Sequence, residues 1–205
     1  MRKRLIILIS IFIILSISIM AIKGKNNNIP IHYYHATYAY DMSSPEKVIG
    51  ATNYTFVGNV KSIKTTEYRN PVEVEITKDG KETKTIYDPY TIYNVEVVEN
   101  IKGRLIDKIE LVEMGGYSKE EKAYVYVDGM SPLKDNHYYM FMAFAVTEGG
   151  ELQITSPYSY VDLNLNSLED LSKNSIYLKY IEAYKNQIIP DDYHDIKAKY
   201  DLNYQ

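Results

Sequence analysis

Strand-length segments with alternating apolar and polar residues recur between positions 54 and 155, and this pattern constrains the fold most. The clearest case is residues 72–77, where valine and isoleucine alternate with acidic or hydroxyl side chains. A Lys-Asp-Gly turn at residues 78–80 leads into a second such segment at residues 83–87. Period-two segments on either side of a glycine turn are typical of a β-hairpin. The sequence therefore predicts a mainly β domain with a protruding hairpin, which solvent surrounds because one of its faces is polar.

Further strands are predicted on both sides of this hairpin. The segment at residues 138–145 is mostly apolar, as expected for a strand buried on both faces. Glycine-containing turns follow several of the other segments. The other predicted strands cover residues 54–63, 91–98, 109–114 and 152–155.

Helices are predicted at the two ends of the domain. Ser44 followed by Pro45 combines an N-cap residue with proline at the first helical position, which predicts a short helix to Ala51. Ser167 begins a capping-box pattern. After it, apolar side chains at helical spacing predict a helix over residues 175–186, and a further short helix is expected over residues 191–200.

An apolar run from Leu5 to Ile22 follows three basic residues at the N-terminus. Crossing the ~30 Å hydrocarbon layer takes a helix of ~20 residues, so this run is a membrane anchor at the short end of the range. A cleaved signal peptide stays an alternative, although Ile19 departs from the small-residue cleavage pattern that would end at Ala21. Either way the domain is expected outside the cytoplasm, anchored in the cell membrane or secreted, because basic residues favour the cytoplasmic side.

The chain is long enough for one domain beyond this segment. The expected organisation is a membrane anchor or signal peptide at residues 1–23, a stalk and short helix at 24–53, a β-barrel domain at 54–160, and a C-terminal helical segment at 161–205.

The composition and net charge of the chain limit the classes of partner that are expected. The sequence has no cysteine and 22 tyrosines, so packing must replace disulfides. The tyrosines are expected at half-buried strand positions, with an aromatic platform for sugar or peptide as the alternative. Residues 26–205 carry 18 basic and 27 acidic side chains, a net charge of −9. Nucleic acid is thus not an expected partner, because phosphate binding relies on lysine and arginine.

Four segments together resemble a bacterial extracytoplasmic domain built as a small OB-like antiparallel barrel. They are residues 55–60 (T-F-V-G-N-V), 93–103 (Y-N-V-E-V-V-E-N-I-K-G), 109–116 and 135–141. The layout is similar to the netrin module of tissue inhibitors of metalloproteinases. The resemblance implies an OB-like fold over residues 54–145. It implies no inhibitory chemistry, because those inhibitors use an N-terminal cysteine that this chain lacks.

Motifs with possible chemistry do not form complete sites. His32 and His35 have metal-pair spacing, but zinc sites take three or four ligands and the other histidines, His137 and His194, are distant in sequence. Residues 162–166 match the first oxygen positions of a calcium loop, yet Lys173 stands where the bidentate glutamate belongs. Nucleophile and phosphate-loop motifs are absent from the sequence. We therefore predict no catalytic, cofactor-binding or metal-binding residue.

Two classes of function remain. The first is a non-enzymatic surface module that binds protein, peptide or glycan through the barrel face or the hairpin at residues 72–87. OB-type barrels commonly bind ligands on one strand face and its flanking loops. The second is an enzyme or protease-inhibitor-like protein of the cell envelope, for which a cleft with convergent polar groups is expected.

Overall fold

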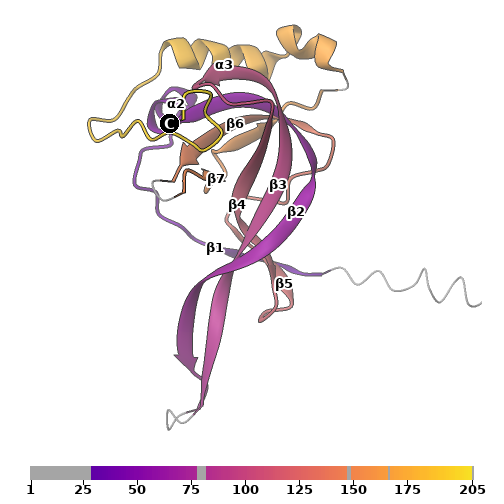
Figure 1. The fold of residues 1–205 in the computed structure, drawn as a ribbon, viewed down its shortest axis with the longest axis vertical. Helices are drawn as coiled ribbons and strands as arrows, with labels where there is room; N and C mark the ends of the chain where they lie inside the picture. The colour runs from indigo at the N-terminus through magenta and orange to yellow at the C-terminus, as the bar shows by residue number, and fades with distance from the viewer. Residues whose placement is uncertain (1–28, 78–81, 147–148, 166, 205) are drawn as a thin grey trace, which may run out of the picture. The chain divides into compact units, whose positions relative to one another are not determined.

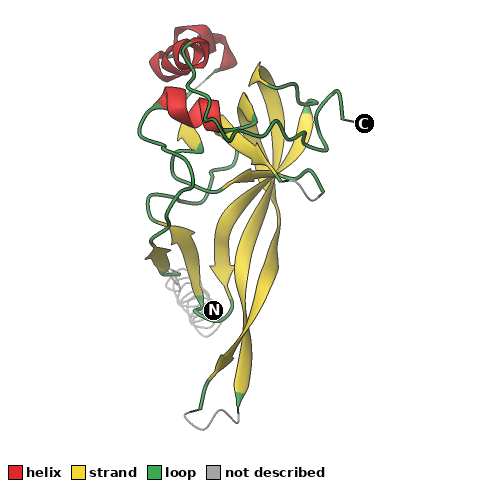
Figure 2. Ribbon diagram, turned by 90° about the vertical axis from the view of Figure 1, so that its left-hand side faces the viewer, coloured by secondary structure: helices red, strands yellow, loops and turns green. Residues whose placement is uncertain are grey.

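A computed structural model describes residues 29–77, 82–146, 149–165 and 167–204. The chain divides into two units, and all the helices and strands given below belong to the second, residues 31–205 (Figures 1 and 2). The predicted membrane segment Leu5–Ile22 lies outside the described residues. Within the described ranges, no helix is both long and apolar enough to span a bilayer.

The second unit is mainly β and has a helix near its C-terminus, as predicted. The strands are β1 (Ile31–Tyr34), β2 (Tyr54–Glu75), β3 (Thr83–Lys102), β4 (Lys108–Ser118), β5 (Ala123–Val127), β6 (Tyr138–Ala145), β7 (Leu152–Ile154) and β8 (Tyr160–Asp162). The helical elements are α2 (Pro45–Ala51), the 3-10 helix η1 (Leu168–Lys173) and α3 (Ser175–Lys185). β1, β5 and β8 were not predicted, and β1 lies in the range expected to hold a stalk and a short helix.

The strands form one sheet in the order β1-β5-β4-β3-β2-β6-β7, with β8 paired to β6. An additional parallel pairing joins β4 to β7 through residues 111–113 and 152–154. Five strands, β2, β3, β4, β7 and β6, are therefore linked in a closed circuit of pairings. All other pairings within this circuit are antiparallel.

The ribbon formed by β2 and β3 runs past the strands beside it (Figure 1). β2 pairs with β6 at residues 54–59, and β3 pairs with β4 at residues 90–96. The pairing between β2 and β3 continues as far as Glu75 and Thr83. The predicted hairpin is thus the outer part of two long strands.

A β-bulge near Asn70 lets β2 continue where the sequence predicts a break. The register shifts between Arg69 and Val72, and Asn70 has a φ of 53°. Proline at position 71 cannot donate to a strand ladder, and bulges are positions at which strands tolerate proline. The two predicted strands 54–63 and 72–77 are therefore one strand.

Two apolar cores lie on opposite faces of the central strands because side chains alternate along each strand. The main core is enclosed by the five-strand circuit and includes Phe56, Tyr93, Leu111, Phe141 and Leu152. The second core lies between the outer faces of β2 and β6 and the helices, and includes Ile49, Val57, Met140, Met142 and Ala183. Partly buried side chains of α3, Ile176, Tyr180 and Tyr184 among them, pack against it.

The C-terminal tail after α3 is held by hydrogen bonds to distant segments. The predicted helix at residues 191–200 is wrong, because this part of the chain forms short turns and bonds to distant segments in place of a helical ladder. The hydroxyl of Tyr54 donates to Asp201 Oδ2 at 2.6 Å and accepts from the backbone N–H of Ala198 at 2.9 Å. Other bonds run from Ile188 N to Glu46 O (3.0 Å), Lys199 N to Gly150 O (2.8 Å) and Leu202 N to Arg104 O (2.8 Å).

Tyr54→Phe should lower the free energy of unfolding by about 1–3 kcal/mol, because it leaves the Ala198 amide without its acceptor. Hydrogen exchange at Ala198 should also become faster. Tyr87→Phe is the matched control, since Tyr87 is 40% exposed on the ribbon and its change should cost less than about 0.5 kcal/mol. Denaturant melts compare the two variants, and equal small losses would show that Tyr54 does not anchor the tail.

Candidate functional site: a tyrosine-lined groove

The helices cover one outer face of the sheet and leave another without helical cover. On β3 and β4 the outward side chains are Tyr90, Ile92, Val112 and Met114, which form a small apolar cluster. The alternation of β3 turns them outward because Tyr93 belongs to the main core. Tyr90, Ile92 and Val112 are buried, and Met114 at the edge of the cluster is only partly buried.

The segment from Tyr34, the last residue of β1, to Met42 lies beside Met114 of this cluster. Between this segment and the outer faces of β4 and β6 is a hollow of about 390 Å³. Its sheet side is formed by Met114, Phe144 and Thr155, and its other side by Tyr34, residues 36–40 and Met42.

A second hollow of about 380 Å³ adjoins the first, because Tyr34 and Met114 line both. It is also lined by Asp88, Pro89, Gly115, Glu121 and Val125. We call the two hollows together the tyrosine groove. It runs across the outer faces of β3, β4 and β6.

The aromatic rings near the groove pack against one another. Tyr40 stacks on Phe144 with centroids 6.3 Å apart and an interplanar angle of 12°. Tyr38 meets Tyr158 edge to face at 81°. These rings form walls, so the groove suits a chain that lies between them better than a flat ring that stacks on an open platform.

One end of the groove is polar and acidic. Burial, with a smaller contribution from the negative charge of Asp88, raises the pKa of the Tyr34 hydroxyl to about 12. Tyr34 is thus a neutral hydrogen-bond donor and acceptor at physiological pH. With Asp88 and Glu121 lining the same hollow, the groove favours neutral or basic ligands over anions.

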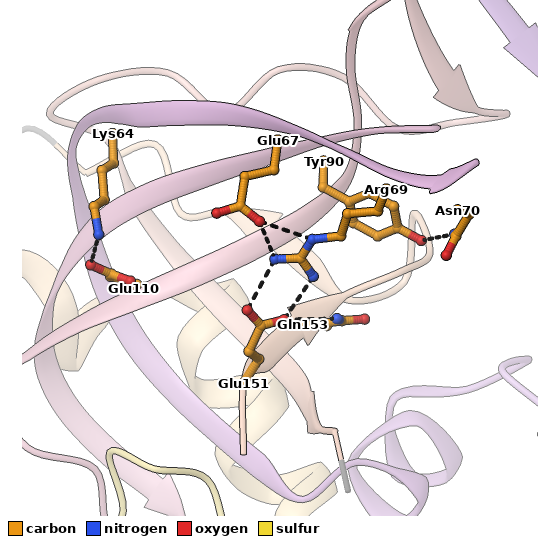
Figure 3. Close-up of polar contacts among 8 residues, drawn as sticks. All are labelled: Lys64, Glu67, Arg69, Asn70, Tyr90, Glu110, Glu151 and Gln153. Carbon is orange, nitrogen blue, oxygen red and sulfur yellow. Dashed lines mark hydrogen bonds and ion pairs between the residues drawn. The ribbon is translucent and has the colours of Figure 1, made fainter. Parts of the chain in front are cut away.

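The ribbon is tied to the β6–β7 connection by an arginine that two carboxylates hold (Figure 3). Arg69 Nη1 donates to Glu151 Oε2 at 2.7 Å and Nη2 donates to Glu151 Oε1 at 3.0 Å. Its Nε and Nη2 also donate to Glu67 Oε2, at 3.0 and 2.6 Å. Two of these bonds go from the guanidinium to the two oxygens of one carboxylate, and such a bidentate pair fixes the orientation of the guanidinium.

Tyr90 connects this ionic cluster to the groove (Figure 3). The Arg69 guanidinium lies 5.0 Å from the centre of the Tyr90 ring, and the Tyr90 hydroxyl accepts from Asn70 Nδ2 at 3.2 Å. Tyr90 also packs in the apolar cluster with Met114. The side chain therefore fixes the base of the ribbon against the groove floor.

His32 and His35, which have metal-pair spacing, each lie beside a different carboxylate. His32 contacts Glu121, His35 contacts Asp128, and His137 Nδ1 lies 3.0 Å from Asp162 Oδ2. Asp162, the first residue of the calcium-like motif, also accepts from the backbone N–H of Asn164. No three histidine, aspartate or glutamate side chains of the described part of the chain are grouped to hold a metal ion.

Sequence reasoning missed one buried acid. Glu113 is 0% exposed and faces inward on β4. The signal was present, because Ile109 and Leu111 occupy the two preceding inward positions and the period of two places Glu113 on the same face.

The chain matches no protein-family model, and it has no significant match among the curated proteins.

The ion pair of Arg69 with Glu151 should contribute measurably to stability. Its side chains are 25% and 27% exposed, so Arg69→Gln should lower the free energy of unfolding by about 1–2 kcal/mol near neutral pH. Lys64→Gln, which breaks the exposed pair with Glu110 shown in Figure 3, is the matched control and should cost under about 0.5 kcal/mol.

The same variants predict a pH dependence. The hydrogen bonds from Arg69 hold the pKa of Glu151 below its ordinary value of 4.5. A depressed carboxyl pKa stabilises the folded state above the unfolded pKa, and the contribution is lost as the pH falls through the folded pKa. The stability difference between wild type and Arg69→Gln should therefore shrink as the pH falls below about 4.5. A difference that stays constant in urea melts down to pH 3 would contradict this assignment.

Proposed function

We propose that residues 31–204 form an OB-like binding module that works outside the cytoplasm and holds an extended peptide in the tyrosine groove. The circuit of β2, β3, β4, β7 and β6 supports the OB-like part of this proposal. Its strand order and its parallel β4–β7 pairing are what a small five-stranded Greek-key barrel requires. The likeness of layout to the netrin module rests on the same strands.

The observation that carries the proposal is the position of the groove. It lies on the outer face of β3 and β4, the second and third strands of the circuit. OB-type barrels bind their ligands on this face and on the loops after the first and fourth strands. Here those two connections are the β2–β3 ribbon and the β6–β7 turn, and Arg69 with Glu151 holds them together.

A peptide fits this groove better than a glycan. Sugar rings bind by stacking on open aromatic faces, whereas Tyr38 and Tyr40 already use faces or edges against Tyr158 and Phe144. Tyrosine rings with Met114 between them suit alternate side chains of an extended chain. The carboxylates of Asp88 and Glu121 favour basic residues in it.

The location outside the cytoplasm is supported by sequence alone. The run Leu5–Ile22 follows Arg2, Lys3 and Arg4, and basic residues before an apolar run stay on the cytoplasmic side. In this proposal residues 5–22 anchor the module in the cell membrane or direct its secretion.

Peptide binding is tested with the full chain in mild detergent and a phage library of random dodecapeptides. We expect enrichment of basic, aromatic sequences. The affinity of an enriched peptide, measured by fluorescence anisotropy, should fall at least about tenfold in Tyr34→Ala, since large aromatic side chains dominate such interfaces. Tyr87→Ala should bind like the wild type, because Tyr34 and Tyr87 are similarly exposed, at 37% and 40%, and Tyr87 does not line the groove.

The same experiment separates the alternatives. Loss of affinity in Tyr87→Ala alone would place the binding surface on the ribbon. If the protein captures cell-wall oligosaccharides and enriches no peptide, the ligand of the groove is a glycan and not a peptide. Equal affinity for all three proteins would contradict the groove as the binding site.

Protease accessibility tests the location. Protease added to intact, wall-stripped cells should remove residues 31–205 if they lie outside the membrane. A surface protein of known topology serves as the positive control. If the domain survives while that control is digested, the proposed topology is wrong.

A further inference from the structure

Glu113 is a carboxyl group sealed inside the main core. It lies on the inner face of β4, opposite Thr91 of β3 and Ile154 of β7, and its side chain has no exposed area. It is separate from the tyrosine groove, which neither contains it nor depends on its charge.

One of its two oxygens is hydrogen-bonded and the other is not. The Tyr93 hydroxyl donates to Glu113 Oε2 at 2.8 Å. Glu113 Oε1 is buried without a hydrogen-bond partner among the described residues. A neutral carboxyl tolerates this arrangement, whereas an ionised one loses much of its solvation.

The titratable groups that face Glu113 are tyrosines from four strands. They are Tyr93 on β3, Tyr126 on β5, Tyr139 on β6 and Tyr160 on β8, and a charge on Glu113 would raise the pKa of each. No basic side chain of the described part of the chain influences the Glu113 carboxyl. Burial raises its pKa to about 8, with the Tyr93 hydrogen bond opposing the shift.

Three of these tyrosines also hold one loop. Residues 128–137 connect β5 to β6, and their backbone is bonded to tyrosine hydroxyls at three points. Ser131 donates to and accepts from the Tyr160 hydroxyl, both at 2.9 Å. The Leu133 amide donates to the Tyr93 hydroxyl at 3.3 Å, and the Lys134 amide donates to the Tyr139 hydroxyl at 3.0 Å.

The loop also excludes water. Met130 and Leu133 are 1% and 4% exposed, and Leu133 is part of the main core that contains Tyr93. The Tyr93 hydroxyl therefore bonds to the loop on one side and to the acid on the other. Movement of the loop is the simplest way to bring water to Glu113.

We propose that residues 128–137 form a pH-sensitive lid, which stays closed while Glu113 is neutral and opens when Glu113 gives up its proton to solvent. In the open state water reaches the carboxylate, so the open state binds the proton less tightly than the closed one. A raised pKa in the closed state stabilises it fully below the ordinary pKa of 4.5, and this stabilisation is lost as the pH rises through about 8.

Hydrogen exchange measured by NMR on the full chain in mild detergent tests the lid. After correction for intrinsic exchange rates, protection of the Leu133 and Lys134 amides should fall by up to tenfold per pH unit between about 4.5 and about 8, as release of one proton requires. The amide of Leu202, which bonds to Arg104 in the tail, should show no such change.

Two glutamine variants complete the test. Glu113→Gln should remove the pH dependence at Leu133 and Lys134. Glu110→Gln, on the outward face of β4 in the pair with Lys64, should keep it. Protection that does not change with pH in the wild type, or the same pH dependence in Glu113→Gln, would overturn the proposal.

Carbon-13 NMR of labelled glutamate carboxyls measures their titration directly in the wild type. This test therefore does not require that Glu113→Gln folds. One carboxyl titrating well above the others, near pH 8, supports the proposal. Titration of every glutamate below about pH 5.5 overturns it. None of these readouts involves the peptide, so failure of the lid and failure of the proposed peptide binding are distinguishable.

Discussion

The parallel pairing of β4 with β7 is the constraint on which the other features depend. It joins residues 111–113 to 152–154 and so closes the five-strand circuit around the main core. It also aligns three sites. Glu113 is turned inward, Glu151 lies just before β7 where it reaches Arg69, and Thr155 just after β7 lines the groove. Parallel neighbours need a long crossover, and here β5, β6 and the tyrosine-held loop supply it.

Different parts of the chain cover the two outer faces of the circuit. α2 and α3 cover β2 and β6, where Met140 and Met142 fill the space beneath them. Beside β3 and β4 the chain supplies residues 34–42, and two hollows meet there at Tyr34 and Met114. Tyrosine suits this position because its ring packs while its hydroxyl meets solvent or a partner. The tyrosines of residues 34–40 and the groove that they line therefore have one physical origin.

The sequence predicts well the parts that local rules determine. Ser44 with Pro45 determines α2, and the apolar run at 138–145 determines β6, both with the bounds observed. Alternation along β4 also carried a signal for Glu113, which shares the inward face with Ile109 and Leu111, but that signal was missed. Local rules do not reveal β1, which pairs in parallel with β5 and whose four residues are all exposed. The tail is likewise determined by distant partners, such as the Tyr54 hydroxyl, and not by helical spacing.

Glu151 and Glu113 show opposite solutions to the cost of removing a carboxyl group from water. Glu151 is paired with an arginine, which fixes its charge and, with it, the base of the ribbon. Glu113 is bonded to a tyrosine hydroxyl, which can donate to a carboxyl in either protonation state while accepting from the Leu133 amide. A lysine in place of Tyr93 would hold the carboxyl ionised at every physiological pH. The tyrosine leaves the charge free to change, and in a domain with a net charge of −9 the surroundings favour the neutral form.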